Sequence, residues 1–468
     1  MSRFSLIYIS IFSLGISVLS FFNIIFSNYF NLYLNLDSYI YSLIISLLFA
    51  LIFLFIKKNE FKITIYEKII TVIGGYLILP LFISIPYYLS IYNISFINAY
   101  FEAVSGFTST GFSIFSNVRH LDESLILWRS SSQWIGGLYF LFSIILLIDI
   151  FDVNLKKSLT NFLSFNTSET LKQSIKILIL YTFLTFVIFI ILNIINIRSF
   201  NSFNLAMTLI SSGGFLPTNN LENIFNTKTK EIILSFLMLI SFFSLFLSYN
   251  LISLKKRNIN FFQEDLYLLI YFCFLVILFF ILFNSEYNFS RIFLALCSSI
   301  SNIGISINEP YKNISFLFLI LTIIGGSFFS TSSGIRFIKL YSLFKFSINE
   351  LISHARPKTI YVNKLEFSNL IFATKDVNKF FISLLIFILS LFILSSLLTI
   401  SGIDLESSFK LSILTLMNTV NSSIHGFGEF NFEELAYFTK CFLIIFMIIG
   451  RVELLTILII MKKLLFKN

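Results

Sequence analysis

The sequence predicts an all-α polytopic membrane protein in which four internal repeats follow two leading transmembrane helices. Hydrophobic residues make up 57% of the 468 positions, charged residues make up 12%, and the mean hydropathy is +0.90. Soluble domains are about half apolar and a quarter charged, so this composition excludes a soluble globular protein. Four short segments rich in serine, threonine and glycine also recur between the apolar stretches, which indicates the repeats.

Apolar stretches along the chain predict the membrane-spanning helices. A span needs about 17 to 25 apolar residues, and about ten such stretches fit in the sequence. Clear examples are residues 5–26, 39–56, 69–91, 232–254 and 380–400. No small-residue cleavage site follows the first stretch, so it reads as a membrane helix and not as a secretory signal.

The lysine and arginine residues predict the orientation. Most of the 33 fall in clusters that one topology brings to a single face, at residues 57–68, 156–176, 255–257, 336–379 and 462–467. The positive-inside rule makes this face cytoplasmic and places both termini inside. The net charge of +9 therefore indicates membrane orientation, and no nucleic acid partner is expected.

Four semi-polar segments lie between successive spans and are too short to cross the bilayer. They read FEAVSGFTSTG (101–111), LAMTLISSGG (205–214), ALCSSISNIG (295–304) and MNTVNSSIHG (417–426). Each has a hydroxyl residue three positions before its last glycine: Thr108, Ser211, Ser301 and Ser423. The predicted organisation is two leading helices (1–60), repeats at 61–157, 172–257 and 264–345, a basic cytoplasmic linker (346–376) and a fourth repeat (377–468).

Backbone outside a helix at membrane depth must be buried in protein or line a water-filled path. Four such segments around one axis predict a pore in which a short helix enters from outside and backbone carbonyls replace an ion's water shell. Glycine leaves no side chain in the lumen, and the negative ends of the short helices favour a cation. The predicted ion-contacting residues are Thr108, Ser109, Thr110, Gly111, Ser211, Ser212, Gly213, Gly214, Ser301, Asn302, Ile303, Gly304, Ser423, Ile424, His425 and Gly426.

The sequence resembles the Trk/Ktr/HKT potassium transporter superfamily, and in particular its bacterial TrkH/KtrB membrane subunits. The resemblance lies in FEAVSGFTSTGFS (101–113), LWRSSSQWIGG (127–137), GGSFFSTSSGIRFIKL (325–340) and IIGRVELLTIL (448–458), and it extends from about residue 60 to the C-terminus. It implies four M1-P-M2 units (a first span, a short pore helix and a second span), with one filter glycine each. Potassium would be the transported ion, bound at Thr108, Gly111, Ser211, Gly214, Ser301, Gly304, Ser423 and Gly426.

The resemblance also implies a homodimer and a cytosolic nucleotide-binding regulatory ring of the TrkA/KtrA type, with no organic cofactor in this chain. The fourth repeat departs from the family pattern. Gly426 is the expected filter glycine, and an alternative alignment puts Ile424 or His425 at that position, which weakens the expectation of strong potassium selectivity.

A hydroxyl-rich stretch interrupts the apolar run at residues 314–340 and predicts a broken helix. Glycine and serine are ordinary causes of kinks, but with the family resemblance we expect a polar loop that obstructs the pore. The predicted gate comprises Gly325, Gly326, Ser327, Ser330, Thr331, Ser332, Ser333, Gly334 and Arg451. The stretch has no GK[ST] ending, so it is not a phosphate-binding loop.

Two arginines fall inside predicted spans, where an uncompensated charge costs at least about 2.5 to 3.5 kcal/mol. For Arg451 we expect gate-loop hydroxyls or carbonyls as partners, because Glu453 at i+2 lies on another helix face. Arg129 follows Trp128 near the outer boundary, and we expect it to reach the membrane edge.

Two other functions compete with a cation pore. A secondary solute transporter typically repeats whole multi-helix halves with paired broken helices, and a membrane enzyme typically gathers His, Asp or Cys at the membrane face. Neither pattern is present, and the three cysteines and three histidines are too dispersed for a metal site. The prediction is therefore a non-enzymatic potassium uptake protein of the inner membrane, with a sodium- and potassium-permeable transporter as the alternative. The basic residues 345–379 fit either the regulatory ring or anionic lipid.

Overall fold

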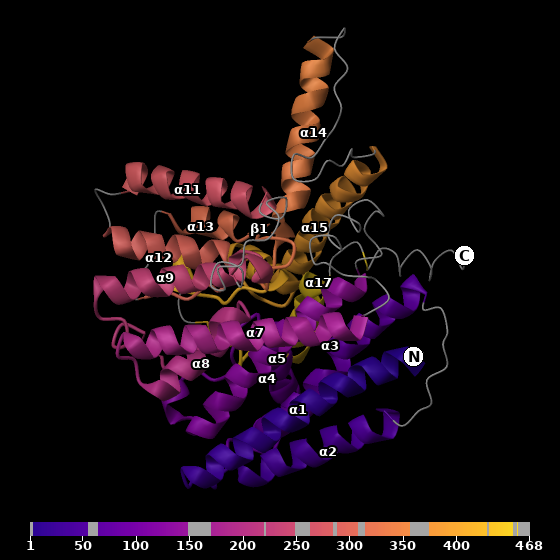
Figure 1. Cartoon of the computed structure of the whole chain (residues 1–468), viewed down its shortest axis with the longest axis vertical. Coiled ribbons are helices and arrows are strands. Elements are labelled where there is room, and N and C mark those ends of the chain that lie inside the picture. The colour runs from indigo at the N-terminus through magenta and orange to yellow at the C-terminus, as the bar shows by residue number, and fades with distance from the viewer. Residues whose placement is uncertain are drawn as a thin grey trace.

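The computed structural model describes residues 3–54, 64–147, 170–219, 221–248, 263–283, 288–307, 314–355, 374–427, 430–452 and 456. These residues form helices almost throughout (Figure 1). Seven helices in the described part are long and apolar enough to cross a membrane, which confirms the predicted all-α polytopic class. The basic residues at 57–62, 156–157, 255–257 and 462–467, and Glu453, lie outside the described residues, as do residues 356–373 of the linker predicted at 346–376. The first ten residues of that predicted linker instead belong to a helix, α14 (Phe337–Ala355).

Two helices precede the repeating part, as predicted. They are α1 (Arg3–Tyr29) and α2 (Leu36–Leu54), which pack on each other along one edge of the molecule (Figure 1). Small hydroxyl residues let them approach closely: Ser20 bonds Ser42 at 3.2 Å, and Ser42 donates to the carbonyl of Phe82 at 3.1 Å. The pair therefore packs against two later helices, α3 (Ile65–Tyr88) and α5 (Glu123–Leu147).

A long helix, a helix of 12 residues and a second helix then recur four times. The first set is α3 (Ile65–Tyr88), α4 (Phe96–Phe107) and α5 (Glu123–Leu147), with the 3-10 helix η1 (Val118–His120) inside it; the second is α7 (Thr170–Ile194), α8 (Ser199–Ile210) and α9 (Lys228–Phe242). The third is α11 (Gln263–Phe283), α12 (Phe289–Ile300) and α13 (Ser315–Leu321), continued by α14 (Phe337–Ala355); the fourth is α15 (Thr374–Ile400), α16 (Leu405–Leu416) and α17 (Tyr437–Arg451), with the 3-10 helix η4 (Ser423–His425).

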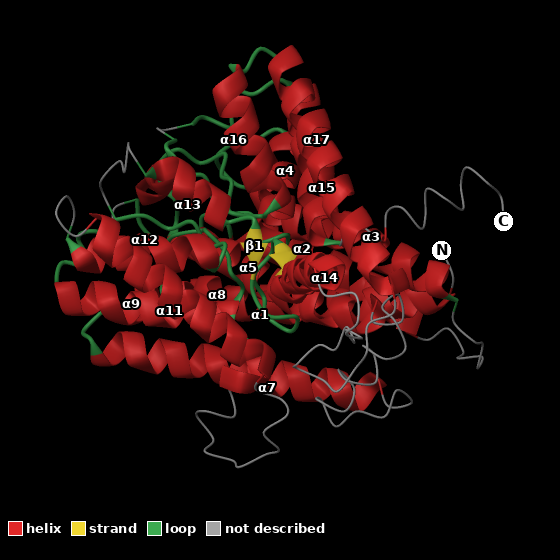
Figure 2. Cartoon of the chain, turned by 90° about the horizontal axis from the view of Figure 1, so that it is seen from above, coloured by secondary structure: helices red, strands yellow, loops and turns green. Residues whose placement is uncertain are grey.

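The four sets close into a ring. The second helix of each set packs on the short helix of the next: α5 on α8, α9 on α12, α13 on α16, and α17 back on α4. Seen from above, β1 lies amid the helices (Figure 2). This cyclic packing brings the C-terminal ends of α4, α8, α12 and α16 towards a common centre.

The second helix of the third set is broken, as the glycine- and serine-rich stretch predicted. After α13 the chain forms β1 (Ile324–Gly325), a loop, and β2 (Ile335–Arg336), which pairs parallel with β1 before α14 begins.

The apolar run at 232–254 is not one continuous helix. Helix α9 ends at Phe242, whose carbonyl accepts the N–H of Ser327 at 3.0 Å, and the N–H of Leu245 donates to the carbonyl of Phe329 at 3.1 Å. The broken ends of α9 and of the third set thus satisfy each other's backbone groups, which is what permits non-helical backbone at this depth.

Asp404 is the N-cap residue of helix α16, the short helix of the fourth set. One carboxylate oxygen of Asp404 accepts the N–H of Ser407 at 2.9 Å. That hydrogen bond holds the pKa of Asp404 below its ordinary value. The helix has 12 residues and ends at Leu416, ten residues before Gly426.

Candidate functional site

Each short helix ends in the same backbone turn. The C-cap residues Thr108, Ser211, Ser301 and Met417 all have φ between −83° and −88°, and the next residue is left-handed in every case. These left-handed residues are Ser109 (φ 56°), Ser212 (56°), Asn302 (58°) and Asn418 (48°). Their N–H groups and those of the following residues donate back to carbonyls in the last helical turn, which is a Schellman motif.

The residue two positions after each left-handed residue lies at the centre of the ring. These residues are Gly111, Gly214, Gly304 and Val420. A Cβ added to Gly111 would lie 2.8 Å from the Cα of Gly214 and 3.1 Å from the Cβ of Val420. A Cβ added to Gly304 would lie 2.6 Å from the carbonyl oxygen of Val420. The four positions therefore converge, and three of them have no room for a side chain.

This convergence shows that the alignment of the fourth repeat on Gly426 is wrong. Ser423, Ile424 and His425 form η4, which packs against α13, and Gly426 lies next to Ser315 and Lys410. The alternatives Ile424 and His425 fail for the same reason. The correct equivalent is Val420, six residues earlier, because helix α16 and its turn end there.

Three of the four chain segments after the turn are tied to their own short helix. The hydroxyl of Ser105 donates to the carbonyl of Phe112 at 2.6 Å, as Thr208 does to Phe215 at 2.9 Å and Ser298 to Ile305 at 2.8 Å. Leu414 occupies the equivalent position in the fourth set and carries no hydroxyl. The fourth segment thus lacks both the glycine and the tie.

The left-handed residues also join neighbouring sets through their side chains. The amide of Asn418 donates to Thr110 at 3.0 Å, and the amide of Asn302 donates to Thr419 at 3.2 Å. The predicted hydroxyls Thr108, Ser211 and Ser301 donate to carbonyls of their own helices at 2.6 to 2.9 Å. The hydroxyl of Thr108 also lies 2.7 Å from that of Thr110. Neutral oxygens thus gather where the C-termini of the short helices converge, a setting that suits a cation stripped of water.

The loop between β1 and β2 lies against the base of this centre. The hydroxyl of Thr331 donates to the carbonyl of Ile210, the last residue of α8, at 2.7 Å. Arg336 holds the loop in shape, because one of its nitrogens donates to the carbonyls of Ser327 and Ser332 at 3.1 and 3.0 Å. Gly326 forms the loop entrance and its N–H donates to the hydroxyl of Ser332 at 3.0 Å.

Arg451 connects this loop to the centre, and the contact with a gate-loop hydroxyl that we expected is present. Its guanidinium donates to the hydroxyl of Ser333, and a second nitrogen lies 3.4 Å from the hydroxyl of Ser109 and 3.5 Å from the carbonyl of Ser211. The ring of Phe140 lies beneath two arginines, 3.9 Å from the Cζ of Arg451 and 5.0 Å from that of Arg336.

Arg129 does not reach the membrane edge, so that expectation is wrong. It is buried and forms an ion pair with Glu102, with 2.9 Å between Nε and Oε1. Glu102 also accepts the N–H of Ile114 at 2.9 Å, and Arg129 donates to the hydroxyl of Ser113 at 2.8 Å. The Arg129 side chain points into the protein because Glu102 and the Ser113 hydroxyl bind it there. The ion pair in turn holds the segment after Gly111 in place.

We expect the Arg129→Met variant to lose about 3 to 5 kcal/mol of stability, because Glu102 would remain buried without its partner. Thermal unfolding of the detergent-solubilised protein measures the loss. The Arg129→Met, Glu102→Met double variant should recover part of it, since no unpaired charge remains. Equal stability of the single variant and the parent would contradict the inference that the pair is structural.

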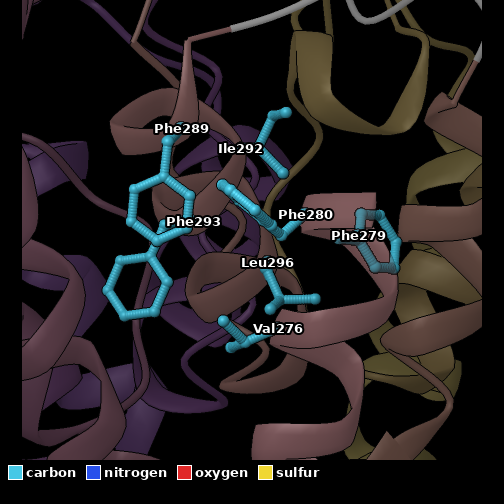
Figure 3. Close-up of a pocket in the computed structure, with 7 residues that line it drawn as sticks. All are labelled: Val276, Phe279, Phe280, Phe289, Ile292, Phe293 and Leu296. Carbon is cyan, nitrogen blue, oxygen red and sulfur yellow. The ribbon is translucent and has the colours of Figure 1, made fainter. Parts of the chain in front are cut away.

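Neither the metal-ligating residues of the described part nor the cavity beside α12 adds a second ion site. No group of three or more His, Cys, Asp or Glu residues that could hold a metal was found among the described residues. A small cavity between α11 and α12 is lined only by hydrocarbon and aromatic side chains (Figure 3): Val276, Phe279, Phe280, Phe289, Ile292, Phe293 and Leu296. It offers an ion no ligand.

Sequence reasoning missed several residues that the structure brings to the site. Val420 and the Asn418 amide were hidden by the alignment on Gly426. The pairing of Glu102 with Arg129, and of Phe140 with two arginines, joins residues 27 or more positions apart that show no common pattern. One signal in the sequence was available for the first three repeats, a hydroxyl residue six positions before each glycine: Ser105, Thr208 and Ser298.

Comparison with known proteins gives consistent similarities. A family model described as "TrkH: Cation transport protein" matches residues 38–289. An uncharacterised cation transporter of Methanocaldococcus jannaschii is 25% identical over 412 residues, covering 82% of this chain and 80% of its own. The Trk system potassium uptake protein TrkG of Escherichia coli is 24% identical over 427 residues, covering 86% of each.

A solved structure is similar over nearly the whole chain. The crystal structure of the potassium transporter TrkH from Vibrio parahaemolyticus matches with a TM-score of 0.82 at 19% identity, and the match covers 98% of both chains. The two chains therefore share a fold.

Proposed function

Because the chain belongs to the TrkH family of cation transport proteins, we propose that it takes up potassium ions across the inner membrane through a pore formed by four repeats. The repeats are residues 61–157, 172–257, 264–345 and 377–468. The observation that carries the proposal is the convergence of Gly111, Gly214, Gly304 and Val420 at the ends of four short helices. The potassium uptake named for the Escherichia coli relative supports the choice of ion.

The proposed filter consists of the four turns at the ends of the short helices. Their carbonyls replace the water shell of the ion, and the helix C-termini add negative potential at the same point. The first three turns contribute residues 108–111, 211–214 and 301–304, as predicted from the sequence. The fourth contributes residues 417–420.

The proposed gate is the loop at residues 325–334 together with Arg451. The loop contacts the end of α8 through Thr331, and Arg451 joins Ser333 to Ser109 beneath the filter. The guanidinium also carries a positive charge close to the helix C-termini, where it competes with a transported cation. Release of the loop would therefore clear the path, and displacement of Arg451 would remove the competing charge.

The proposed partners are a second copy of the chain, a cytosolic nucleotide-binding ring of the TrkA/KtrA type, and membrane lipid. Helix α14 projects beyond the other helices (Figure 1) and exposes Phe344 and Leu351, which supports a docking role for this end. The topology that fits these partners has both termini in the cytoplasm.

Rubidium uptake tests the proposed function directly. The full chain is expressed in a host that lacks its own potassium uptake, and rubidium entry is measured with and without competing sodium. We expect uptake above that of the empty host, with sodium competing less well than potassium. Equal competition by both ions would favour the alternative of a sodium- and potassium-permeable transporter, and entry no faster than in the empty host would refute the proposal.

A further inference from the structure

Val420 occupies the place in the fourth repeat that glycine occupies in the other three. The preceding turn is the same in all four repeats, since Asn418 is left-handed like Ser109, Ser212 and Asn302. Counting two residues onward gives Gly111, Gly214, Gly304 and Val420. The equivalence thus follows from backbone geometry and does not depend on which residue types align.

The Val420 side chain fills the space that the three glycines leave. A Cβ added to Gly214 would contact the Val420 Cβ and lie 2.9 and 3.0 Å from its two methyl carbons. A Cβ added to Gly304 would lie 2.8 Å from one of the same methyl carbons. A branched hydrocarbon group therefore stands where the other repeats present only backbone.

The backbone of Val420 is also constrained differently. Gly111 and Gly304 adopt φ values of +82° and +73°, a region that β-branched residues strongly disfavour and that neither Gly214 nor Val420 adopts. The serine or threonine hydroxyl that fixes the following carbonyl in the other repeats is replaced by Leu414. The carbonyl that follows Val420 therefore lacks the hydrogen bond that orients the carbonyls of Phe112, Phe215 and Ile305.

We infer that Val420 is a specificity-determining residue that makes the ion-selecting ring asymmetric and lowers its discrimination between potassium and sodium. Discrimination by a carbonyl ring depends on the number and field of the oxygens that replace the water shell. A ring in which one position carries a branched side chain and lacks the hydroxyl tie coordinates the larger and the smaller ion less differently than a ring of four glycine positions with four ties. This inference rests on the proposed uptake function and deepens it.

The test uses the purified full chain in liposomes, where rubidium uptake and its inhibition by sodium give a selectivity ratio. We expect Val420→Gly to raise the preference for rubidium over sodium by roughly tenfold, which corresponds to about 1.4 kcal/mol. Val420→Ala should raise it less, because a Cβ remains. Gly426→Ala serves as the matched control, since Gly426 lies away from the ring and should leave the ratio unchanged.

Two results would overturn the inference. One is an unchanged ratio in both Val420 variants while the parent and the variants all take up rubidium; the other is a changed ratio in Gly426→Ala alone. Absence of cation uptake by the folded parent would instead refute the proposed function, and the inference with it. Val420→Gly could misfold because glycine adds backbone freedom. Val420→Ala adds none, so it tests the inference even if the glycine variant misfolds.

Discussion

Replacing Gly111 by aspartate is expected to reduce rubidium uptake to the level of a host without the transporter. A Cβ at this position meets the Cα of Gly214 at 2.8 Å, so a side chain can fit only by displacing the backbone of the neighbouring repeat. The φ of +82° adds strain for any residue other than glycine. Uptake in whole cells, corrected for the amount of protein in the membrane, measures the effect.

Gly402→Asp is the matched control for this prediction. Gly402 also has a positive φ, of +94°, but a Cβ added there meets nothing within 4 Å. Both variants therefore carry backbone strain, and only Gly111→Asp crowds the centre of the ring. Loss of uptake in both would point to strain alone and would contradict a filter at Gly111.

A serine at Gly111 should keep some uptake and lower the preference for potassium over sodium. Its smaller side chain still forces the neighbouring backbone to shift, which turns a carbonyl away from the ion. Gly214→Ser and Gly304→Ser are expected to act in the same direction. An unchanged ratio of potassium to sodium in all three variants would refute the filter assignment.

Arg451→Ala is expected to raise rubidium flux in the absence of any regulatory subunit while leaving ion preference intact. The variant removes the bond to Ser333, and a hydrogen bond to a charged group contributes about 1.5 to 3 kcal/mol. If that bond favours only the closed state, its loss shifts the equilibrium towards open by roughly tenfold to a hundredfold. The variant changes no residue of the filter turns. Its contacts to the hydroxyl of Ser109 and the carbonyl of Ser211 are long, at 3.4 and 3.5 Å, so selectivity should persist without them.

The matched control is Arg198→Ala, because Arg198 is an exposed arginine paired with Glu123 at the surface. Deletion of residues 327–333 should also raise flux, although this loop supplies N–H groups to the end of α9 and its loss threatens folding. Only variants whose dimer yield in detergent matches the parent can be compared. Unchanged flux in well-folded Arg451→Ala would remove the gate from the proposal, and reduced selectivity would mean that the loop supports the filter.

The sequence was sufficient to predict the fold class. Lipid permits only structures that satisfy their backbone groups internally, so long apolar runs dictate helices wherever they occur. The two leading helices, the short helices of the first three repeats and the break after α13 were all predicted for this reason. The run at 232–254 was the exception, because contacts from a loop some 80 residues later end α9 at Phe242.

The site was predictable only where local sequence determines it. The glycines of the first three repeats stand out because each position is crowded, and because Gly111 and Gly304 also adopt a positive φ that accepts little else. In the fourth repeat this signal is absent, and the nearest glycine, Gly426, misled the alignment. The turn after α16 has the same left-handed residue as the other three turns, at Asn418, but Val420 follows it in place of a glycine, so only the structure reveals the equivalence.

The sequence by itself determined that this chain is a helical membrane protein with three glycine turns, a broken helix and buried arginines in need of partners. The tertiary structure alone decided that Val420 completes the ring, that Glu102 pairs with Arg129, and that Phe140 lies under two guanidinium groups. Hydropathy and backbone preference act over a few residues and can be read along the chain. Charge pairing and close packing are satisfied by whichever residues the ring brings together, and the order of the sequence does not record that choice.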